Sequence, residues 1–227
     1  MNKIIEYSDT LEHKLLGRGE NGNCFLTPDN KVFKRFDNPS YYEKKISSLL
    51  GINVPTFVFP QALVQAKDVI IGYIMEYVEG MQIKYKTNQI SISEYINALK
   101  VSEYDIAAIS NLGIYSIDLK DENVLFSSDK GFKIIDTDFY AKTKDKKGLY
   151  MHNMGNFTYA VLNPLFDIYT TSFNDRKLRN EYSKLIDGKL LPSRFISLLL
   201  KYMSIEDTRS INLEEMSNEL KLLYKKN

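Results

Sequence analysis

The first eighty residues alternate apolar and polar positions over short stretches, and this period of two is typical of β-strands. Three such stretches are separated by turn residues: 13–19 (HKLLGRG), 23–29 (NCFLTPD) and 31–36 (KVFKRF). The segment 62–80 (ALVQAKDVIIGYIMEYVEG) predicts two further strands on either side of a turn at Lys67 and Asp68. The pattern therefore predicts a β-rich first part of the chain.

One helix is predicted to interrupt these strands. Residues 38–52 (NPSYYEKKISSLLGI) indicate a helix that begins near Asn38 or Ser40 and ends at Gly51. From Ile92 onward the pattern changes to a helical period. Residues 91–113 (SISEYINALKVSEYDIAAISNLG) predict an amphipathic helix that stops at its final glycine.

Two short strands follow, 123–128 (NVLFSS) and 131–136 (GFKIID), and the Asp-Lys-Gly turn between them favours a hairpin. The rest of the chain is predicted to be mainly helical, notably 193–203 and 213–226. A β-rich part and a helical part predict an α+β fold with two lobes, which we divide near Gly80. Residues 1–79 would form the first lobe and residues 80–227 the second, with a cleft between them as the favoured place for a ligand.

Composition places the chain among ordinary globular proteins. It has 227 residues, 44% of them hydrophobic and 26% charged, and its net charge of +1 offers no basic excess for nucleic acid or an anionic membrane. Cys24 is the only cysteine, so no intrachain disulfide can form. Apolar runs such as FISLLL are far shorter than the ~20 residues of a membrane helix. We expect a soluble, cytoplasmic protein, and the oligomeric state stays open.

A glycine motif lies between the first two predicted strands. Gly17, Gly19 and Gly22 have the spacing G-x-G-x-x-G. A strand follows the motif, so it is not a dinucleotide-binding fingerprint, and no Gly-Lys-Ser/Thr ends it, so it is not a Walker loop. The motif is either an ordinary turn or a loop whose backbone N–H groups approach phosphates.

Lys34 is a second candidate. Alternation places it on the same face of its strand as Val32 and Phe36, where a buried ammonium would be costly unless it were paired. Glu43, on the predicted helix that follows, is a possible partner. In the alternative reading Lys34 faces solvent and Phe33 faces the core.

The stretch IDLKDENVLF carries the most specific signal. Asp118 and Asn123 are five residues apart with Lys120 between them, and Asp136 follows eighteen residues after the aspartate. Because a hairpin returns its two ends to the same place, Asn123 and Asp136 would lie side by side as oxygen ligands for Mg²⁺. Asp118 would stand nearby as a base, with Lys120 close to the transferred charge. The alternative is a charged hairpin with solvated ends.

In order along the chain, these motifs resemble those of the protein-kinase family, in a compact, divergent form similar to bacterial serine/threonine kinases. The resemblance implies a bilobal kinase-like fold, ATP and Mg²⁺ as cofactors, and phosphoryl transfer to a hydroxyl group. It places Lys34 on the α- and β-phosphates with Glu43 as its helix partner. It also implies that Asp118 is the base and that Asn123 and Asp136 hold the metal.

The resemblance extends to the hinge between the lobes, where YIMEYVEG matches the family. Met75 would be the gatekeeper, and the backbone of Glu76 and Val78 would meet the adenine. Cys24, which follows the glycine motif, and Leu125 would complete the nucleotide-binding residues.

The chain also departs from the family. His-Arg-Asp has become Ser116-Ile117-Asp118, and the missing arginine implies that no phosphorylated activation loop is needed. Asp-Phe-Gly has become Asp136-Thr137-Asp138, in which Asp138 would accept the positive φ of the glycine.

Four further features bear on the resemblance. Lys34 and Glu43 are only nine residues apart (43 − 34), and no Ala-Pro-Glu appears between Asp136 and Asp167 to build a peptide-docking platform. Asp167 would brace the catalytic loop, and Arg209 matches the family's closing arginine without its usual glutamate partner.

Three functions stay open. The first is ATP- and Mg²⁺-dependent transfer of the γ-phosphate to a serine or threonine of an unidentified protein, which Lys120 favours. The second is a small-molecule phosphotransferase similar to aminoglycoside or choline kinases, which IDTD and the missing platform favour. The third is a pseudokinase that binds nucleotide as a scaffold without turnover.

Overall fold

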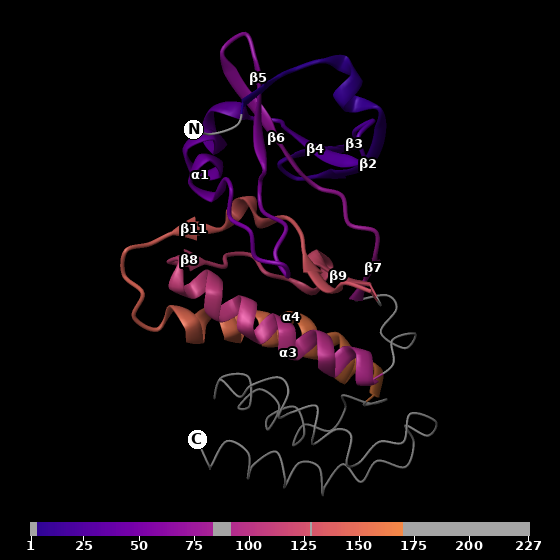
Figure 1. Cartoon of the computed structure of the whole chain (residues 1–227), viewed down its shortest axis with the longest axis vertical. Coiled ribbons are helices and arrows are strands. Elements are labelled where there is room, and N and C mark those ends of the chain that lie inside the picture. Colours follow the sequence, from indigo (N-terminus) through magenta and orange to yellow (C-terminus); the bar gives the residue numbers. More distant parts are fainter. Residues whose placement is uncertain (1–3, 84–91, 128, 170–227) are drawn as a thin grey trace, which may run out of the picture.

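The computed structural model describes residues 4–83, 92–127 and 129–169. Over these residues the chain is a mixed α+β structure with a mainly antiparallel sheet (Figure 1). The described ranges contain three α-helices: α1 (Pro39–Leu49), α3 (Ile92–Asn111) and α4 (Leu149–Tyr169). None of these helices is long and apolar enough to cross a membrane.

The main sheet has six strands in the order β1-β5-β6-β4-β3-β2. The strands are β1 (Ile4–Glu6), β2 (Lys14–Gly19), β3 (Gly22–Leu26), β4 (Lys31–Phe36), β5 (Ala62–Ala66) and β6 (Val69–Glu76). The five strands predicted from alternation are confirmed, and Lys67 and Asp68 form the β5–β6 turn with φ of 50° and 63°. Alternation did not reveal β1, a three-residue edge strand that pairs in parallel with β5.

Strand β4 is buried on both of its faces. Val32 and Phe36 pack in one apolar cluster with Ile46 of α1, whereas Phe33 packs in a second cluster on the opposite side of the sheet. Lys34 is therefore 5% exposed and Phe33 is 0% exposed. The alternative reading in which Lys34 faces solvent is therefore wrong, although Phe33 does face the core.

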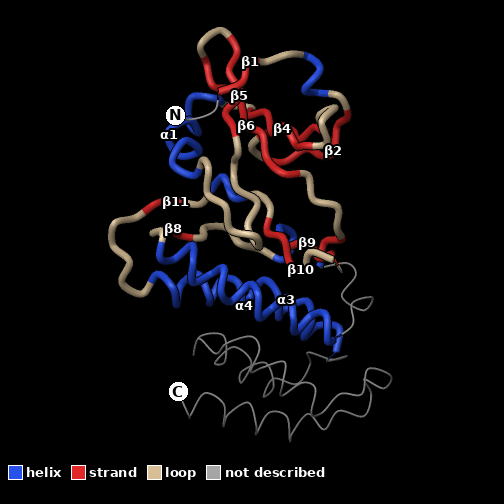
Figure 2. Tube along the Cα trace, in the orientation of Figure 1, coloured by secondary structure: helices blue, strands red, loops and turns tan. Residues whose placement is uncertain are grey.

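The helices α3 and α4 pack against each other, and short strands lie between them and the main sheet (Figure 2). These strands are β7 (Met81–Gln82), β8 (Ile114–Tyr115), β9 (Val124–Ser127), β10 (Gly131–Ile134) and β11 (Ala141–Lys142). The predicted helix over 91–113 and the β9–β10 hairpin are confirmed. The helices predicted over 193–203 and 213–226 lie outside the described residues.

Hydrogen bonds of the loop between α1 and β5 connect it to the β9–β10 hairpin and to α3. The amide of Val58 donates to the carbonyl of Ile134 (2.9 Å), and the amide of Ile134 donates to the carbonyl of Thr56 (2.7 Å). The amide of Thr56 donates to Oδ2 of Asp105 on α3 (2.8 Å), and its hydroxyl lies 3.2 Å from that of Ser102. These bonds fix the position of β4 relative to the residues that follow β10.

Candidate active site

Lys34 lies between two carboxylates that come from far along the chain. Its ammonium hydrogen-bonds to Asp136, 102 residues away, and lies 2.9 Å from Oδ2 of Asp138. The side chain of Lys34 is 6% exposed, that of Asp136 35% and that of Asp138 0%. We call these three residues the buried ion trio. One positive charge faces two negative charges, so the trio as a whole is negative.

The charges of the trio set one another's protonation. Burial works to lower the pKa of Lys34, but the two carboxylates outweigh it and the pKa is raised, so the ammonium stays charged. Burial raises the pKa of Asp136, but the attraction of Lys34 lowers it by more, so the pKa is lowered overall. Burial raises the pKa of Asp138 to about 6 against the attraction of Lys34. At neutral pH both carboxylates are therefore mainly ionised.

A left-handed residue turns the chain after β10 so that both aspartates reach Lys34. Asp136 has φ 60° and ψ 43°, and Thr137–Phe139 form a single 3-10 turn after it. The hydroxyl of Thr137 donates to the carbonyl of Val58 (2.8 Å), which anchors this turn. We predicted a positive φ at Asp138, and that is wrong. The left-handed residue is Asp136, and Asp138 sits inside the 3-10 turn.

The two ends of the β9–β10 hairpin meet beside the trio. Asn123 ends the 3-10 turn Asp121–Asn123, and the amide of Ile135 donates to its carbonyl (2.9 Å). The side-chain amide of Asn123 donates to the carbonyl of Asp118 (3.2 Å). Asn123 is thus tied both to Asp118 and to the residue that precedes Asp136.

Asp118 is also a left-handed residue, with φ 63°, and its carboxylate pairs with Lys120 at 2.8 Å. This bond is the main reason that the pKa of Lys120 is raised, and Glu20 at the tip of the glycine turn adds to the effect. Lys120 in turn helps to lower the pKa of Asp136. The loop of Asp118, the glycine turn and the trio therefore lie within electrostatic reach of one another.

The glycines of the turn between β2 and β3 differ in what the fold requires of them. Gly22 has φ +153°, and a Cβ there would lie 2.1 Å from the backbone oxygen of Arg35. A Cβ on Gly17 would meet no atom within 4 Å, and one on Gly19 only a backbone oxygen at 3.6 Å. Packing accounts for Gly22 alone, whereas close approach of a ligand to the backbone would account for Gly17 and Gly19.

Four of the residues predicted to bind the nucleotide pack in one apolar cluster. They come from separate parts of the chain: Cys24 from β3, Met75 from β6, Val78 from the segment after β6 and Leu125 from β9. Met75 and Val78 are buried, and the other two are half-buried. Glu76, also predicted to bind, pairs its carboxylate with Lys133 of β10 at 3.5 Å.

The predicted pair of Lys34 with Glu43 is not formed. Glu43 is exposed on α1, and the ion-pair partners of Lys34 in the described structure are Asp136 and Asp138. Helix α1 begins at Pro39, three residues after β4 ends at Phe36. Lys45 of that helix lies 4.8 Å above the ring of Phe139.

The sequence analysis did not predict the side chains that hydrogen-bond to the loop before Asp118. Oδ1 of Asn153 on α4 accepts hydrogen bonds from both the amide and the hydroxyl of Ser116, each at 2.9 Å. Asn156, one helical turn later, donates to the carbonyl of Ser116 (2.7 Å). The spacing HNMGN in an otherwise apolar helix was the available signal. The side chain of Asp167, which we predicted to brace this loop, and all of Arg209 lie outside the described residues.

Buried oxygens without hydrogen-bond partners gather at the trio. Within the described ranges they are the hydroxyls of Tyr73 and Tyr140 and Oδ1 of Asp138, whose Oδ2 lies 2.9 Å from Lys34 Nζ. Burial raises the pKa of both tyrosines, and Asp136 contributes in each case. An unpaired buried polar atom costs about 1–3 kcal/mol, so such atoms indicate bound water or a polar ligand.

The side-chain oxygens of Asp136 and Asn123 fit a magnesium ion that keeps most of its hydration shell. No group of three or more His, Cys, Asp or Glu side chains suited to a metal is found among the described residues. Mg²⁺ does not need one, because it is commonly held by one or two protein oxygens together with phosphates and water. The partly exposed carboxylate of Asp136 and the amide oxygen of Asn123 match that requirement.

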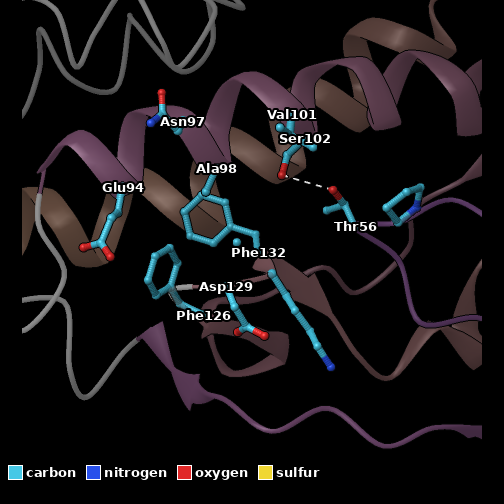
Figure 3. Close-up of a pocket in the computed structure, with 12 residues that line it drawn as sticks. Thr56, Glu94, Asn97, Ala98, Val101, Ser102, Phe126, Asp129 and Phe132 are labelled. Atoms are coloured by element: carbon cyan, nitrogen blue, oxygen red, sulfur yellow. Dashed lines mark hydrogen bonds between the residues drawn. The ribbon is translucent and has the colours of Figure 1, made fainter.

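A cavity of about 260 Å³ lies elsewhere, between α3 and the β9–β10 hairpin (Figure 3). Glu94, Ala98 and Ser102 of α3 line it opposite Phe126 and Phe132. None of its lining residues is among the predicted site residues.

The sequence matches no protein-family model, and no curated protein matches it. The assignment of a function therefore depends on the geometry of the described residues.

The burial of Cys24 predicts slow alkylation. Desolvation raises the pKa of this thiol to about 11, against an ordinary value of 9.0, despite the opposing attraction of Lys34. Because the thiolate is the reactive form, iodoacetamide at pH 8 should modify Cys24 roughly 100-fold more slowly than a free cysteine. The rate should rise about tenfold per pH unit between pH 8 and 10. A rate equal to that of free cysteine at pH 8 would contradict the placement.

Proposed function

We propose that the chain is an ATP- and Mg²⁺-dependent phosphotransferase with a bilobal, protein-kinase-like fold, which transfers the γ-phosphate to a serine or threonine hydroxyl of a protein. Residues 1–79 form the nucleotide-binding lobe and residues 80–227 the catalytic lobe. The observation that carries the proposal is the contact of Lys34 with Asp136 across 102 residues. A charged hairpin with solvated ends would not require an ion pair between Lys34 and Asp136.

The nucleotide lies against the apolar cluster and under the glycine turn. Cys24, Met75, Val78 and Leu125 offer an apolar surface to the adenine, a grouping that the cluster supports. The backbone at Gly17 and Gly19 approaches the phosphates, since neither glycine is needed for packing. Lys34, kept charged by its carboxylates, neutralises the α- and β-phosphates.

Asn123 and Asp136 would hold Mg²⁺, which supplies charge neutralisation between the phosphates. The net negative charge of the trio and the partial exposure of Asp136 favour a cation at this place. The hydrogen bonds of Asn123 to the Asp118 loop keep the metal site and the base at a fixed separation.

Asp118 accepts the proton of the acceptor hydroxyl. As that proton leaves, the hydroxyl oxygen forms a bond to the γ-phosphorus, and the bond from phosphorus to the β-phosphate oxygen breaks, which leaves ADP. Lys120, paired with Asp118 at 2.8 Å, offsets the charge on the transferred group. The two asparagines of α4 orient this loop, so that catalysis is mostly positioning and electrostatic stabilisation.

A small alcohol is the second candidate acceptor, and the brevity of the segment between Phe139 and Leu149 favours it. Strand β11 within that segment pairs with β8, and the amide of Thr143 donates to the carbonyl of Gly113 (2.7 Å). Little chain is left there to build a platform for a peptide.

Transfer of labelled γ-phosphate from ATP with Mg²⁺ tests the proposal. Acceptors are the protein itself, generic protein substrates and a panel of small alcohols. Asp118→Asn should lower the rate by about 10²–10⁴-fold, because the general base is lost. Asp136→Asn should have a similar effect through the metal. The matched control is Asp129→Asn, which alters an exposed aspartate in the hairpin turn and should keep the wild-type rate.

The outcomes separate the candidates. Label in protein that both variants abolish supports the first proposal, and label in a small alcohol alone supports the second. Tight ATP binding with no transfer to any acceptor would identify a pseudokinase scaffold. Absence of both binding and transfer would overturn the proposal.

The glycine turn gives a prediction with an internal control. Gly22→Ala should lower the free energy of unfolding by about 1–3 kcal/mol, because its Cβ would overlap the backbone of Arg35. Gly17→Ala should leave stability unchanged or raise it by up to ~1 kcal/mol, since nothing blocks its Cβ. It should nevertheless weaken ATP binding roughly tenfold, equivalent to ~1.4 kcal/mol. Denaturant unfolding and calorimetric titration measure the two effects, and unchanged ATP affinity in Gly17→Ala would count against the loop's role.

A further inference from the structure

We propose that Asp138 is the positioning residue that holds Lys34 in place for the nucleotide phosphates, the task that the sequence assigned to Glu43. This inference rests on the proposed function as far as the phosphates are concerned. The pairing of the two side chains stands on geometry alone.

The first support is the contact itself. Lys34 Nζ lies 2.9 Å from Oδ2 of Asp138, and neither side chain has appreciable access to solvent, with exposures of 6% and 0%. A buried ammonium without a counter-charge is strongly disfavoured, so a charged partner must come from a neighbouring element. Asp138 meets that requirement from the 3-10 turn after β10.

The second support is the difference between the two carboxylates. The side chain of Asp136 is 35% exposed and that of Asp138 is 0% exposed. Asp136 can therefore turn to a ligand on the solvent side, whereas Asp138 has no solvent to turn to. When Asp136 engages that ligand, Asp138 remains as the fixed counter-charge of Lys34.

The third support is the anchoring of the turn. Thr137 is wholly buried, and its hydroxyl donates to the carbonyl of Val58 at 2.8 Å. Val58 is itself bonded to Ile134 of β10. The residue after Thr137 is thereby directed at β4. In the described part of the chain, the ion pair with Lys34 at 2.9 Å is the principal stabilising contact of the Asp138 carboxylate.

Helix α1 offers Lys34 no competing anion. Glu43 is exposed, whereas Lys45 of α1 lies 4.8 Å from the centre of the Phe139 ring and within electrostatic reach of Asp138. The helix therefore contributes a second cation near Asp138 in place of an anion for Lys34.

A double-mutant cycle on the folding equilibrium of the full chain tests the pairing without any need for activity. The variants are Lys34→Met, Asp138→Asn and the double variant. A parallel cycle combines Lys34→Met with Glu43→Gln. The effect of Asp138→Asn on the unfolding equilibrium constant should differ at least tenfold between the wild-type and Lys34→Met backgrounds. The effect of Glu43→Gln should be the same in both backgrounds.

Each result of the cycle decides the matter. Equal effects of Asp138→Asn in the two backgrounds, or coupling of Lys34 with Glu43, would overturn the proposal. If Asp138→Asn alone does not fold, recovery of folding in the double variant counts as coupling, and failure to recover counts against it.

The affinity for ATP and for adenosine separates positioning from a merely structural role. Asp138→Asn should weaken ATP binding at least tenfold and change adenosine binding less than twofold. In the proposed complex the phosphates are the only part of the nucleotide that Lys34 contacts, and adenosine has none. Equal weakening of both ligands would contradict the positioning role. If wild type binds neither ligand but the cycle shows coupling, the proposed function fails and the pairing of Lys34 with Asp138 stands.

Discussion

The burial of the Lys34 ammonium is the constraint on which the rest of the structure depends. Strand β4 is covered on both faces, so the lysine cannot reach bulk water and must be neutralised from within. The carboxylates that neutralise it follow β10, about a hundred residues later. The chain must therefore hold β10 against β4, and the hydrogen bonds of Thr56 and Val58 to Ile134 provide that link.

The burial of Lys34 also determines where negative charge gathers in the structure. Two carboxylates on one lysine leave an excess of negative charge. The buried hydroxyls of Tyr73 and Tyr140, which have no hydrogen-bond partner in the described residues, lie within its electrostatic reach. Such a place favours a cation and polar ligand atoms. The hairpin brings Asn123 and the Asp118 loop to its edge, and α4 fixes that loop through Asn153 and Asn156. These features support the proposal of a site for a metal-bound phosphate compound.

Local patterns in the sequence predicted the elements formed by neighbouring residues. The five strands, the first helix, the helix that stops at Gly113 and the β9–β10 hairpin follow from alternation, period and turn residues. The hairpin also predicted that Asn123 and Asp136 would come together. Strands β1, β7, β8 and β11 were not predicted, because each has only two or three residues and depends on a partner far along the chain.

The partner of Lys34 could not be predicted in the same way. Alternation shows which residues of a strand share a face, but not which distant anion will meet them. Glu43 was near in sequence, whereas Asp138 reaches Lys34 through a left-handed residue at Asp136 and an anchored turn, neither of which the sequence displays. The bracing by Asn153 was hidden for a similar reason, since a polar residue in a helix usually faces solvent.

The central claim is that the buried ion trio forms part of a site for magnesium and a nucleoside triphosphate. Calorimetric titration of the wild-type chain with a non-hydrolysable ATP analogue, with Mg²⁺ and then with a chelator, tests it most directly. The account predicts one nucleotide per chain with a dissociation constant between about 1 μM and 1 mM. It also predicts at least tenfold weaker binding when Mg²⁺ is removed. Absence of nucleotide binding, or an affinity that is the same with and without Mg²⁺, would contradict it.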